Sequence, residues 1–577
     1  MWRVFVAVVF FALWACCAGA QSQEEMDAVM LLTGCTLPEE MDEYEIERLS
    51  HYIEHPVRIN TVSLAFLRSC GLFTSYQAAS LTDYRQRHGD VMSLTELSSV
   101  DGFTPEKVRA LSPFISLEGG SVNGMDSQTS HDLAVKGGAA VSDGVPVGGY
   151  GLKYRCESSG RWSAAFAFSR ANDGSMGRPD AWSGHLAWDM ERIPLRILAG
   201  DFNARFGQGL ALWNGFSMSG AGKTNSFFRS SSGLSSSWSY TGSSALTGVA
   251  SELSIARMRI SALVALPGIK NKGLSGMDVL PAVNVGWYGR NMSASLSHYA
   301  EFSRYSSGTY IPDMKTSVDL AACLRGTDLF GEIAFDWVNM TAAVLAGTIF
   351  PCVEEVRTAV HLRYYPTGFN PARSAALRSG TKCSNEYSLS LSSDYQRKSG
   401  GLTAGLSVDA SYRPKPQSGT ENNIQVKILN DCAVSFSDSF QLKFRLSERL
   451  RTWGQKSRTD VRADLIWTLN HFVFTSRINV LHCKGTGLLG YAEGGYRKDD
   501  LSVYLRVGVY RIDNWDDRIY VYERDAPGNF TVPAMYGRGA WVSFTTAWKY
   551  ARWGRLYVRA TKKPGKAELK LQSVFSF

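Results

Sequence analysis

Apolar side chains recur at every second position from about residue 130 to the end of the chain. In one such segment Leu501, Val503, Leu505, Val507 and Val509 alternate with Ser502, Tyr504, Arg506, Gly508 and Tyr510. Because successive side chains of a strand point to opposite faces of the sheet, each segment has one apolar and one polar face. Segments of about ten residues with this pattern are typical of strands that cross an outer membrane as a closed barrel. The sequence therefore predicts a transmembrane antiparallel β-barrel over residues 121–577.

Two other structures are compatible with alternating segments or with a membrane location. A soluble sandwich or propeller also alternates, but it would place charged residues outside and would rarely sustain so many strands of this length. No apolar run after residue 20 reaches the ~18 residues that a transmembrane helix requires. With about 17 residues for each strand and its connection, residues 121–577 provide an even number of strands, about 22 to 26. A barrel of this width must be plugged or it leaks.

The first 20 residues have the three parts of a secretory signal peptide. A short positive start at residues 1–3 precedes an apolar stretch at 4–17, and residues 18–20 (Ala-Gly-Ala) fit a cleavage site. A buried N-terminal helix is one alternative, and a lipoprotein with its lipid on Cys16 is another. We expect cleavage of the signal peptide and export to the outer membrane.

Residues 21–120 have a different period and a different charge from the rest of the chain. Apolar residues at helical spacing in 41–49 and 78–84 predict a small all-α domain. This domain has a net charge of −9, whereas residues 121–577 have a net charge of +16. The basic residues of the barrel either attract anions to the lumen or rim, or contact anionic lipid of the outer leaflet.

Residues 56–117 contain two similar units, in which 67–74 and 97–104 each lead into a helix. They resemble the tandem helix-hairpin-helix module of ComEA-type competence DNA receptors. In that family each hairpin reads Gly-hydrophobic-Gly, so that the backbone approaches a phosphate at the start of the next helix. The resemblance implies a candidate nucleic-acid site made of Gly71, Thr74, Gly102, Thr104, Lys107 and Arg109.

This chain departs from the family pattern in both hairpins. Phe73 and Thr104 stand where the second glycine is expected. Residues 56–117 carry six basic and five acidic side chains, and the acidic residues of 39–47 would repel a polyanion. We therefore expect weak, non-specific DNA binding at most, and we favour a structural or protein-docking role for the module.

Three further stretches bear on the whole chain. Residues 200–213 and 532–539 are similar to segments of exported helix-hairpin-helix proteins that are fused to a large outer-membrane barrel. Residues 569–577 resemble the terminal strand of outer-membrane barrels, in which the aromatic last residue, here Phe577, is an assembly signal. The resemblance implies two partners, outer-membrane lipid and the barrel assembly machinery.

The sequence contains no convincing catalytic or metal-binding motif. His51, Glu54 and His55 match H-x-x-E-H, but Pro56 follows at once and indicates the end of a helix. The cysteines form no C-x-x-C, and Cys35 with Cys70 is the one disulfide pair that we consider. We expect no cofactor, no metal and no enzyme activity.

These patterns favour an outer-membrane channel, transporter or surface protein. Its helical domain would plug the pore or dock an unidentified periplasmic partner. The alternative is a nucleic-acid receptor or uptake protein that holds the DNA backbone with the helix-hairpin-helix module.

Overall fold

The computed structural model describes residues 23–118 and 129–577 of the chain. Short gaps fall at 34, 36, 42, 159–160, 175–176, 191–192, 216–219, 230, 241–244, 256, 273–277, 290, 306–307, 398–399, 417–422, 438, 455–456 and 499. The predicted signal peptide, including Cys16, lies outside the described residues. No helix within the described part of the chain is long and apolar enough to cross a bilayer.

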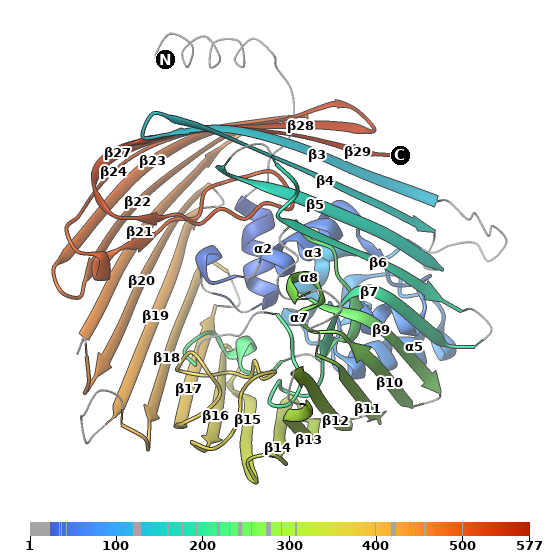
Figure 1. Ribbon diagram of the computed structural model, residues 1–577. Helices are drawn as coiled ribbons and strands as arrows, with labels where there is room; N and C mark the ends of the chain where they lie inside the picture. The colour runs from blue at the N-terminus through green and yellow to red at the C-terminus, as the bar shows by residue number, and fades with distance from the viewer. Residues whose placement is uncertain are drawn as a thin grey trace.

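Twenty-four antiparallel strands close into one barrel (Figure 1). The first twelve are β3 (Thr129–Ser142), β4 (Val145–Ser158), β5 (Trp162–Gly174), β6 (Ala181–Asp189), β7 (Leu195–Arg205), β9 (Leu246–Ile255), β10 (Met258–Ala265), β11 (Leu280–Tyr288), β12 (Met292–Tyr305), β13 (Gly308–Leu324), β14 (Thr327–Asp336) and β15 (Thr341–Val353). The other twelve are β16 (Val356–Tyr365), β17 (Glu386–Gln396), β18 (Leu402–Tyr412), β19 (Ile424–Ser437), β20 (Phe440–Arg451), β21 (Ser457–Leu469), β22 (Phe472–His482), β23 (Thr486–Lys498), β24 (Leu501–Ile512), β27 (Gly537–Ala551), β28 (Gly554–Lys563) and β29 (Lys566–Ser576). The predicted fold class and the even strand number are confirmed.

The last strand closes the barrel by pairing with the first wall strand. β29 and β3 pair in antiparallel register from Lys566 opposite Ser142 to Ser576 opposite Asp132. Beyond the strand, the Phe577 amide donates a hydrogen bond to the His131 carbonyl at 3.0 Å, and the two rings stack. The terminal segment therefore supplies the seam of the wall.

The alternation predicted from the sequence sorts side chains between the two faces of the wall. On β17, Leu389 and Leu391 are 42% and 46% exposed, whereas Ser390 and Ser392 between and beyond them are buried. Closure satisfies the backbone hydrogen bonds that an open edge would leave unmet in lipid. A closed barrel with this apolar outer face belongs in the outer membrane, and the chain is an outer-membrane protein.

The two ends of the barrel have connections of different length. The turns are short at the end of the barrel where β29 finishes, as at 353–356 and 469–472. The opposite end has three long loops, at 206–245, 366–385 and 513–536. Outer-membrane barrels have short periplasmic turns and longer extracellular loops, so the termini lie on the periplasmic side.

Two of the long loops, 206–245 and 513–536, and the connection before β11 contain short elements of their own. These are η3 (Thr224–Ser226), β8 (Gly233–Ser236), α8 (Ile269–Lys272), η5 (Trp515–Asp517), β25 (Ile519–Tyr520) and β26 (Ala534–Met535). β8 pairs with the last residues of β7, while β9 pairs with β7 directly, so β8 lies beside the closed wall.

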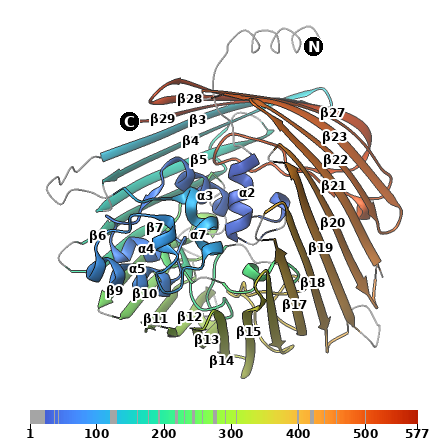
Figure 2. The same ribbon diagram turned by 180° about the vertical axis from the view of Figure 1, so that it is seen from behind.

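The N-terminal helices lie inside the ring of strands in both views (Figures 1 and 2). They are α2 (Gln23–Thr33), η1 (Pro38–Glu40), α3 (Glu43–Glu54), α4 (Leu64–Ser69), α5 (Ser75–His88), α6 (Leu94–Leu97), α7 (Pro105–Leu111) and η2 (Ser112–Phe114). The parallel pair β1 (Val57–Arg58) and β2 (Ile115–Ser116) joins the early and late parts of this region. We call residues 23–118 the plug.

The plug has a hydrophobic core of its own. Its buried apolar residues form one cluster that runs from Met26 to Ile115 and includes Phe73, Phe103 and Phe114. Among the described residues of the barrel, Tyr522 and Phe530 pack against this cluster. The plug is therefore a folded body within the lumen and does not depend on the wall for its core.

Candidate functional site: the closed lumen

The three long extracellular loops fold into the lumen and share hydrophobic clusters with the wall. Phe206, Leu212 and Phe369 of the loops lie in one cluster with Tyr299 and Tyr365 of the strands. Ile519 and Met535 of the third loop lie in another, with Trp541 of β27. Moving these loops out would expose apolar area on both partners.

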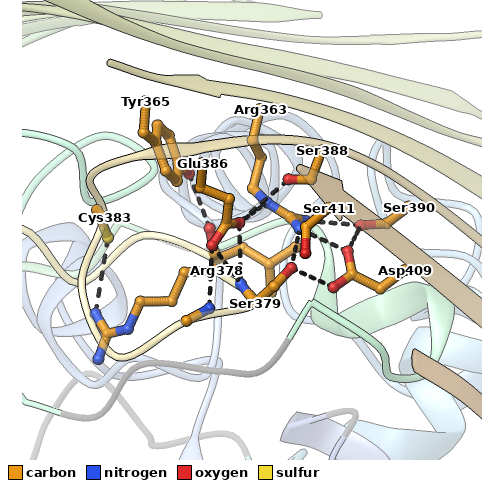
Figure 3. A network of polar contacts seen from close by, with 12 residues as sticks. Arg363, Tyr365, Arg378, Ser379, Cys383, Glu386, Ser388, Ser390, Asp409 and Ser411 are labelled. Carbon is orange, nitrogen blue, oxygen red and sulfur yellow. Dashed lines mark hydrogen bonds and ion pairs between the residues drawn. The ribbon is translucent and has the colours of Figure 1, made fainter. Parts of the chain in front are cut away.

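Loop 366–385 is also held by a buried polar network (Figure 3). The guanidinium of Arg363 on β16 contacts the carboxylates of Glu386 at 3.0 Å and Asp409 at 2.5 Å. Glu386 in turn accepts hydrogen bonds from the backbone amides of Ser379 and Gly380, both at 3.0 Å. One buried arginine thus fixes three strands and the loop in one arrangement.

The other two loops are anchored in the same manner. Glu332 on β14 accepts hydrogen bonds from the backbone amides of Gln208 at 2.7 Å and Leu210 at 3.0 Å. In loop 513–536, Asp525 contacts Arg559 on β28 at 2.8 Å. Buried charges on the wall are therefore paired with the loops that cover them.

The plug contacts the wall through ion pairs, most of which have the acidic partner on the plug; Lys107 with Asp328 has the opposite polarity. Acidic side chains of the plug meet basic side chains of the wall, in the pairs Glu45 with Arg205, Glu47 with Lys153, and Glu39 with Arg462 and Arg477. The Glu39 contacts measure 3.3 Å to Arg462 and 3.1 Å to Arg477. Part of the basic charge predicted for a lumen therefore lies inside the barrel and faces the acidic plug.

The charges at this interface perturb two plug carboxyls. Burial raises the pKa of Glu39, but Arg462, Arg477 and the Tyr522 backbone amide lower it to about 2. Burial likewise raises the pKa of Glu45, but Arg48 and Arg205 lower it to about 2. Both carboxylates stay ionised at neutral pH and hold their partners.

His51 of α3 faces the wall from the neighbouring turn. Its Nε2 lies 3.1 Å from Nη1 of Arg155 on β4, and its ring lies beside that of His55. Burial, Arg155 and His55 lower the pKa of His51 well below its usual range. His51 is therefore neutral while the plug is seated. The helix end predicted at Pro56 agrees with α3, which ends at Glu54.

The glycines of the two predicted hairpins face side chains of the plug itself. Gly71 and Gly102 have φ of +72° and +87°, a conformation that favours glycine. A Cβ on Gly71 would lie 1.6 Å from Arg48 Nη1, which donates to the Cys70 carbonyl at 2.6 Å. A Cβ on Gly102 would lie 2.7 Å from the Tyr76 ring. Neither glycine presents an open backbone surface.

The residues after the glycines have local structural roles. Thr74 caps α5 and forms a capping box with Gln77, whose Oε1 accepts from the Thr74 amide at 2.9 Å. Thr104 caps α7 and accepts from the Lys107 amide at 3.4 Å. Phe73 is fully buried against Phe103. Phe73, which stands where the family pattern has a second glycine, belongs to the core of the plug.

The two basic candidates on α7 diverge. Lys107 lies 3.7 Å from Asp328 on β14, whereas Arg109 is exposed. Residues two apart on a helix face different directions, so one surface cannot use both side chains. The considered disulfide is also wrong, because Cys35 and Cys70, both described, are not joined to each other.

Several cavities remain between the plug and the wall, and one of about 70 Å³ is lined by Thr74, Gly102 and Lys107 of the plug together with residues of β11 to β14. One of about 180 Å³ lies beside α3 and is lined by His51, Arg155 and His185 among others. Another, of about 360 Å³, lies between α2, η1, strands β17 to β24 and loop 513–536. No cluster of His, Cys, Asp or Glu suited to a metal ion occurs among the described residues.

Comparison with known proteins gives a match in structure alone. No protein-family model matches the chain, and no curated protein sequence matches it. The translocation pore of the P pilus usher PapC is 10% identical, with 78% of this chain and 99% of that chain covered and a TM-score of 0.38. A mutant ferric enterobactin receptor PfeA from Pseudomonas aeruginosa is 8% identical, with 78% and 80% covered and a TM-score of 0.41. The copper transporter OprC is 9% identical, with 78% and 83% covered and a TM-score of 0.38. These likenesses say nothing of what this protein binds.

Proposed function

We propose that this protein is an outer-membrane channel or transporter that the plug closes and that opens when the plug moves. The observation that carries the proposal is the difference between the plug's core and its interface. The core is apolar and self-contained, whereas the contacts to the wall include at least three ion-pair sites, at Glu39, Glu45 and Glu47. Breaking these contacts exposes charged groups to water and leaves the plug folded.

The width of the barrel requires some such closure. A barrel of eight strands is filled by its own side chains, whereas much larger barrels leave an aqueous channel or hold a separate plug. Here the in-folded loops fill part of the lumen and the plug fills another part. Removing the plug leaves a path along a wall whose inner face carries charged and polar groups, such as Lys153, Arg205 and Arg462.

We do not extend the proposal to DNA uptake. Arg48 and Tyr76 cover the hairpin glycines, and Lys107 pairs with the wall. The resemblance of residues 56–117 to a helix-hairpin-helix module stays a prediction, and it is compatible with a module that docks proteins. A periplasmic partner that binds the plug and draws it from the lumen fits the proposal.

The direct test removes the acidic contacts and leaves the core intact. We expect Glu39→Gln with Glu45→Gln and Glu47→Gln to raise the open probability of single channels in planar bilayers at least tenfold. The matched control is Glu47→Lys with Lys153→Glu, which exchanges the charges of one pair and should keep the closed state. Equal open probability in the triple variant and the wild type would refute the gating role of the plug.

A further inference from the structure

The cavity of about 360 Å³ beside the plug has an unusual lining. Seven basic side chains and three carboxylates line it, and the basic ones are Lys223, Lys443, Arg445, Arg462, Arg477, Arg506 and Arg524. Two of the carboxylates are each shared by two arginines. Asp464 contacts Arg462 at 2.7 Å and Arg477 at 2.5 Å, and Glu493 contacts Arg506 at 2.6 Å and Arg524 at 3.0 Å. The cavity wall therefore has an excess of positive charge.

The opposite side of the same cavity is apolar and belongs to the plug. Met30, Leu31, Leu37 and Pro38 line it from α2 and the start of η1. The volume is at the lower end of those that hold small organic ligands. A ligand that satisfies both sides carries an anionic group on an apolar body.

Glu39 of the plug already occupies one end of the basic surface. Its carboxylate contacts Arg462 and Arg477 and accepts a hydrogen bond from the Tyr522 amide at 3.0 Å. This geometry shows that the two arginines can hold a carboxylate at this position. An incoming anion would compete with Glu39 for them.

The basic surface continues along β20 toward the extracellular end of the barrel. The inward positions of this strand include Lys443, Arg445, Arg449 and Arg451, and Arg451 is its last residue. Arg449 pairs in register with Lys427 of β19 and with Arg458 of β21, which puts three basic residues in one row. Such a strip raises the local concentration of anions along its length.

We propose that the cavity is a binding site for a small organic anion, an oxyanion on an apolar body, that enters along β20 and competes with Glu39 for Arg462 and Arg477. The site rests on the proposed function, because it names the class of ligand that reaches the plug. Lys443 and Arg445 supply its first contacts, and the apolar edge of α2 and η1 selects against inorganic anions. Binding there removes a partner from Glu39 and so weakens the seat of the plug.

Calorimetric titration of the full-length protein in nanodiscs tests this site with three probes: phenyl phosphate, inorganic phosphate and phenol. We expect phenyl phosphate to bind at least tenfold tighter than inorganic phosphate, and phenol to show no binding. Lys443→Gln with Arg445→Gln should weaken phenyl phosphate at least tenfold. The control is Arg538→Gln, an exposed arginine of β27 outside both the cavity lining and the strip along β20, and it should change the affinity less than threefold.

The variant Glu39→Gln tests whether Glu39 competes with the ligand or has only a structural role. It should tighten phenyl phosphate binding about threefold or more, because it frees Arg462 and Arg477, whereas a merely structural glutamate would give weaker or unchanged binding. Equal affinity for phenyl phosphate and inorganic phosphate, or no effect of Lys443→Gln with Arg445→Gln, would overturn the assignment. Binding is measured without passage, so its failure with gating intact refutes this site alone, and loss of gating with binding intact refutes the proposed function alone.

Discussion

The plug and the three in-folded loops both fill the lumen, but they are joined to the wall in different ways. The loops share hydrophobic clusters with the strands, as Phe369 does with Tyr365. The buried apolar cluster of the plug consists of plug residues, with Tyr522 and Phe530 of loop 513–536 packed against it, and the plug also meets the wall at charged pairs such as Glu47 with Lys153. Apolar contacts resist separation in water, whereas exposed ions are solvated. Under the proposed function, this difference makes the plug the moving part and the loops part of the wall.

Deleting the plug and deleting one loop, each in turn, should give the largest difference between the two regions. We expect residues 121–577 alone to assemble and to conduct far more than the full-length chain, because the wall keeps its own clusters. Deletion of 366–385 should instead impair assembly, because it exposes Arg363 and the apolar partners of the loop. Single-channel conductance and heat-modifiable mobility in gels measure the two effects. Equal conductance with and without the plug would break the distinction.

A single substitution in the loop network should have the next largest effect. Arg363→Gln leaves Glu386 and Asp409 buried without their cation, and loss of one partner of a buried pair costs about 3–5 kcal/mol. We expect a lower unfolding temperature of the barrel in detergent with an unchanged open probability. Arg538→Gln, at a pair that is largely exposed, is the control and should cost about 0–1 kcal/mol. If Arg363→Gln opened the channel without lowering the unfolding temperature, loop 366–385 would not be a fixed part of the wall.

The sequence predicted the wall far better than the closure of the lumen. The alternation of apolar and polar residues is a local property, so each strand can be predicted from its own residues, as residues 501–510 predict β24. The closing contacts join distant residues, such as Glu47 with Lys153 or Gln208 with Glu332, and no spacing connects them. The opposite net charges of the two regions were the one signal of their contact.

The hairpin site shows a second limit of sequence reasoning. Spacing placed Phe73 where a glycine was expected, but Thr74 caps α5 three residues after Gly71, while Thr104 caps α7 two residues after Gly102. The first hairpin is therefore one residue longer, and the extra length places Phe73 in the core. A position in a motif does not determine which way a side chain points.

Acid should loosen the contacts between the plug and the wall. A released His51 takes up a proton near pH 6.5, whereas the seated one has a lowered pKa, so the seating that it supports is lost as pH falls below ~6.5. Glu39 and Glu45 have lowered pKa values of about 2, so their contribution persists above about 4.5 and is lost from there toward 2. Bilayer recordings should show open probability rising in two steps, and His51→Gln should remove the first. A flat profile between pH 7 and 4 would contradict the account.

The smallest effect is expected for nucleic acid. Residues 21–120 should bind duplex DNA no tighter than roughly 10⁻⁴ M at physiological salt. Arg109→Glu should change this binding more than Thr104→Gly, because Arg109 is exposed and Thr104 caps a helix. Fluorescence anisotropy measures both. Micromolar affinity in 150 mM salt, weakened by added salt, would favour the receptor alternative.

The central claim is that the plug leaves the wall while the loops stay, and thiol labelling tests it most directly. Lys153→Cys places a thiol on the wall under the plug, and Ser390→Cys places one under loop 366–385. A water-soluble maleimide is added to each full-length variant, and residue-level mass spectrometry separates the new thiol from native cysteines. We expect Lys153→Cys to be labelled, at least tenfold faster when Glu39→Gln and Glu45→Gln are added, and Ser390→Cys to stay unlabelled in both backgrounds. Equal labelling rates at the two positions, or no response to the glutamate substitutions, would contradict the account.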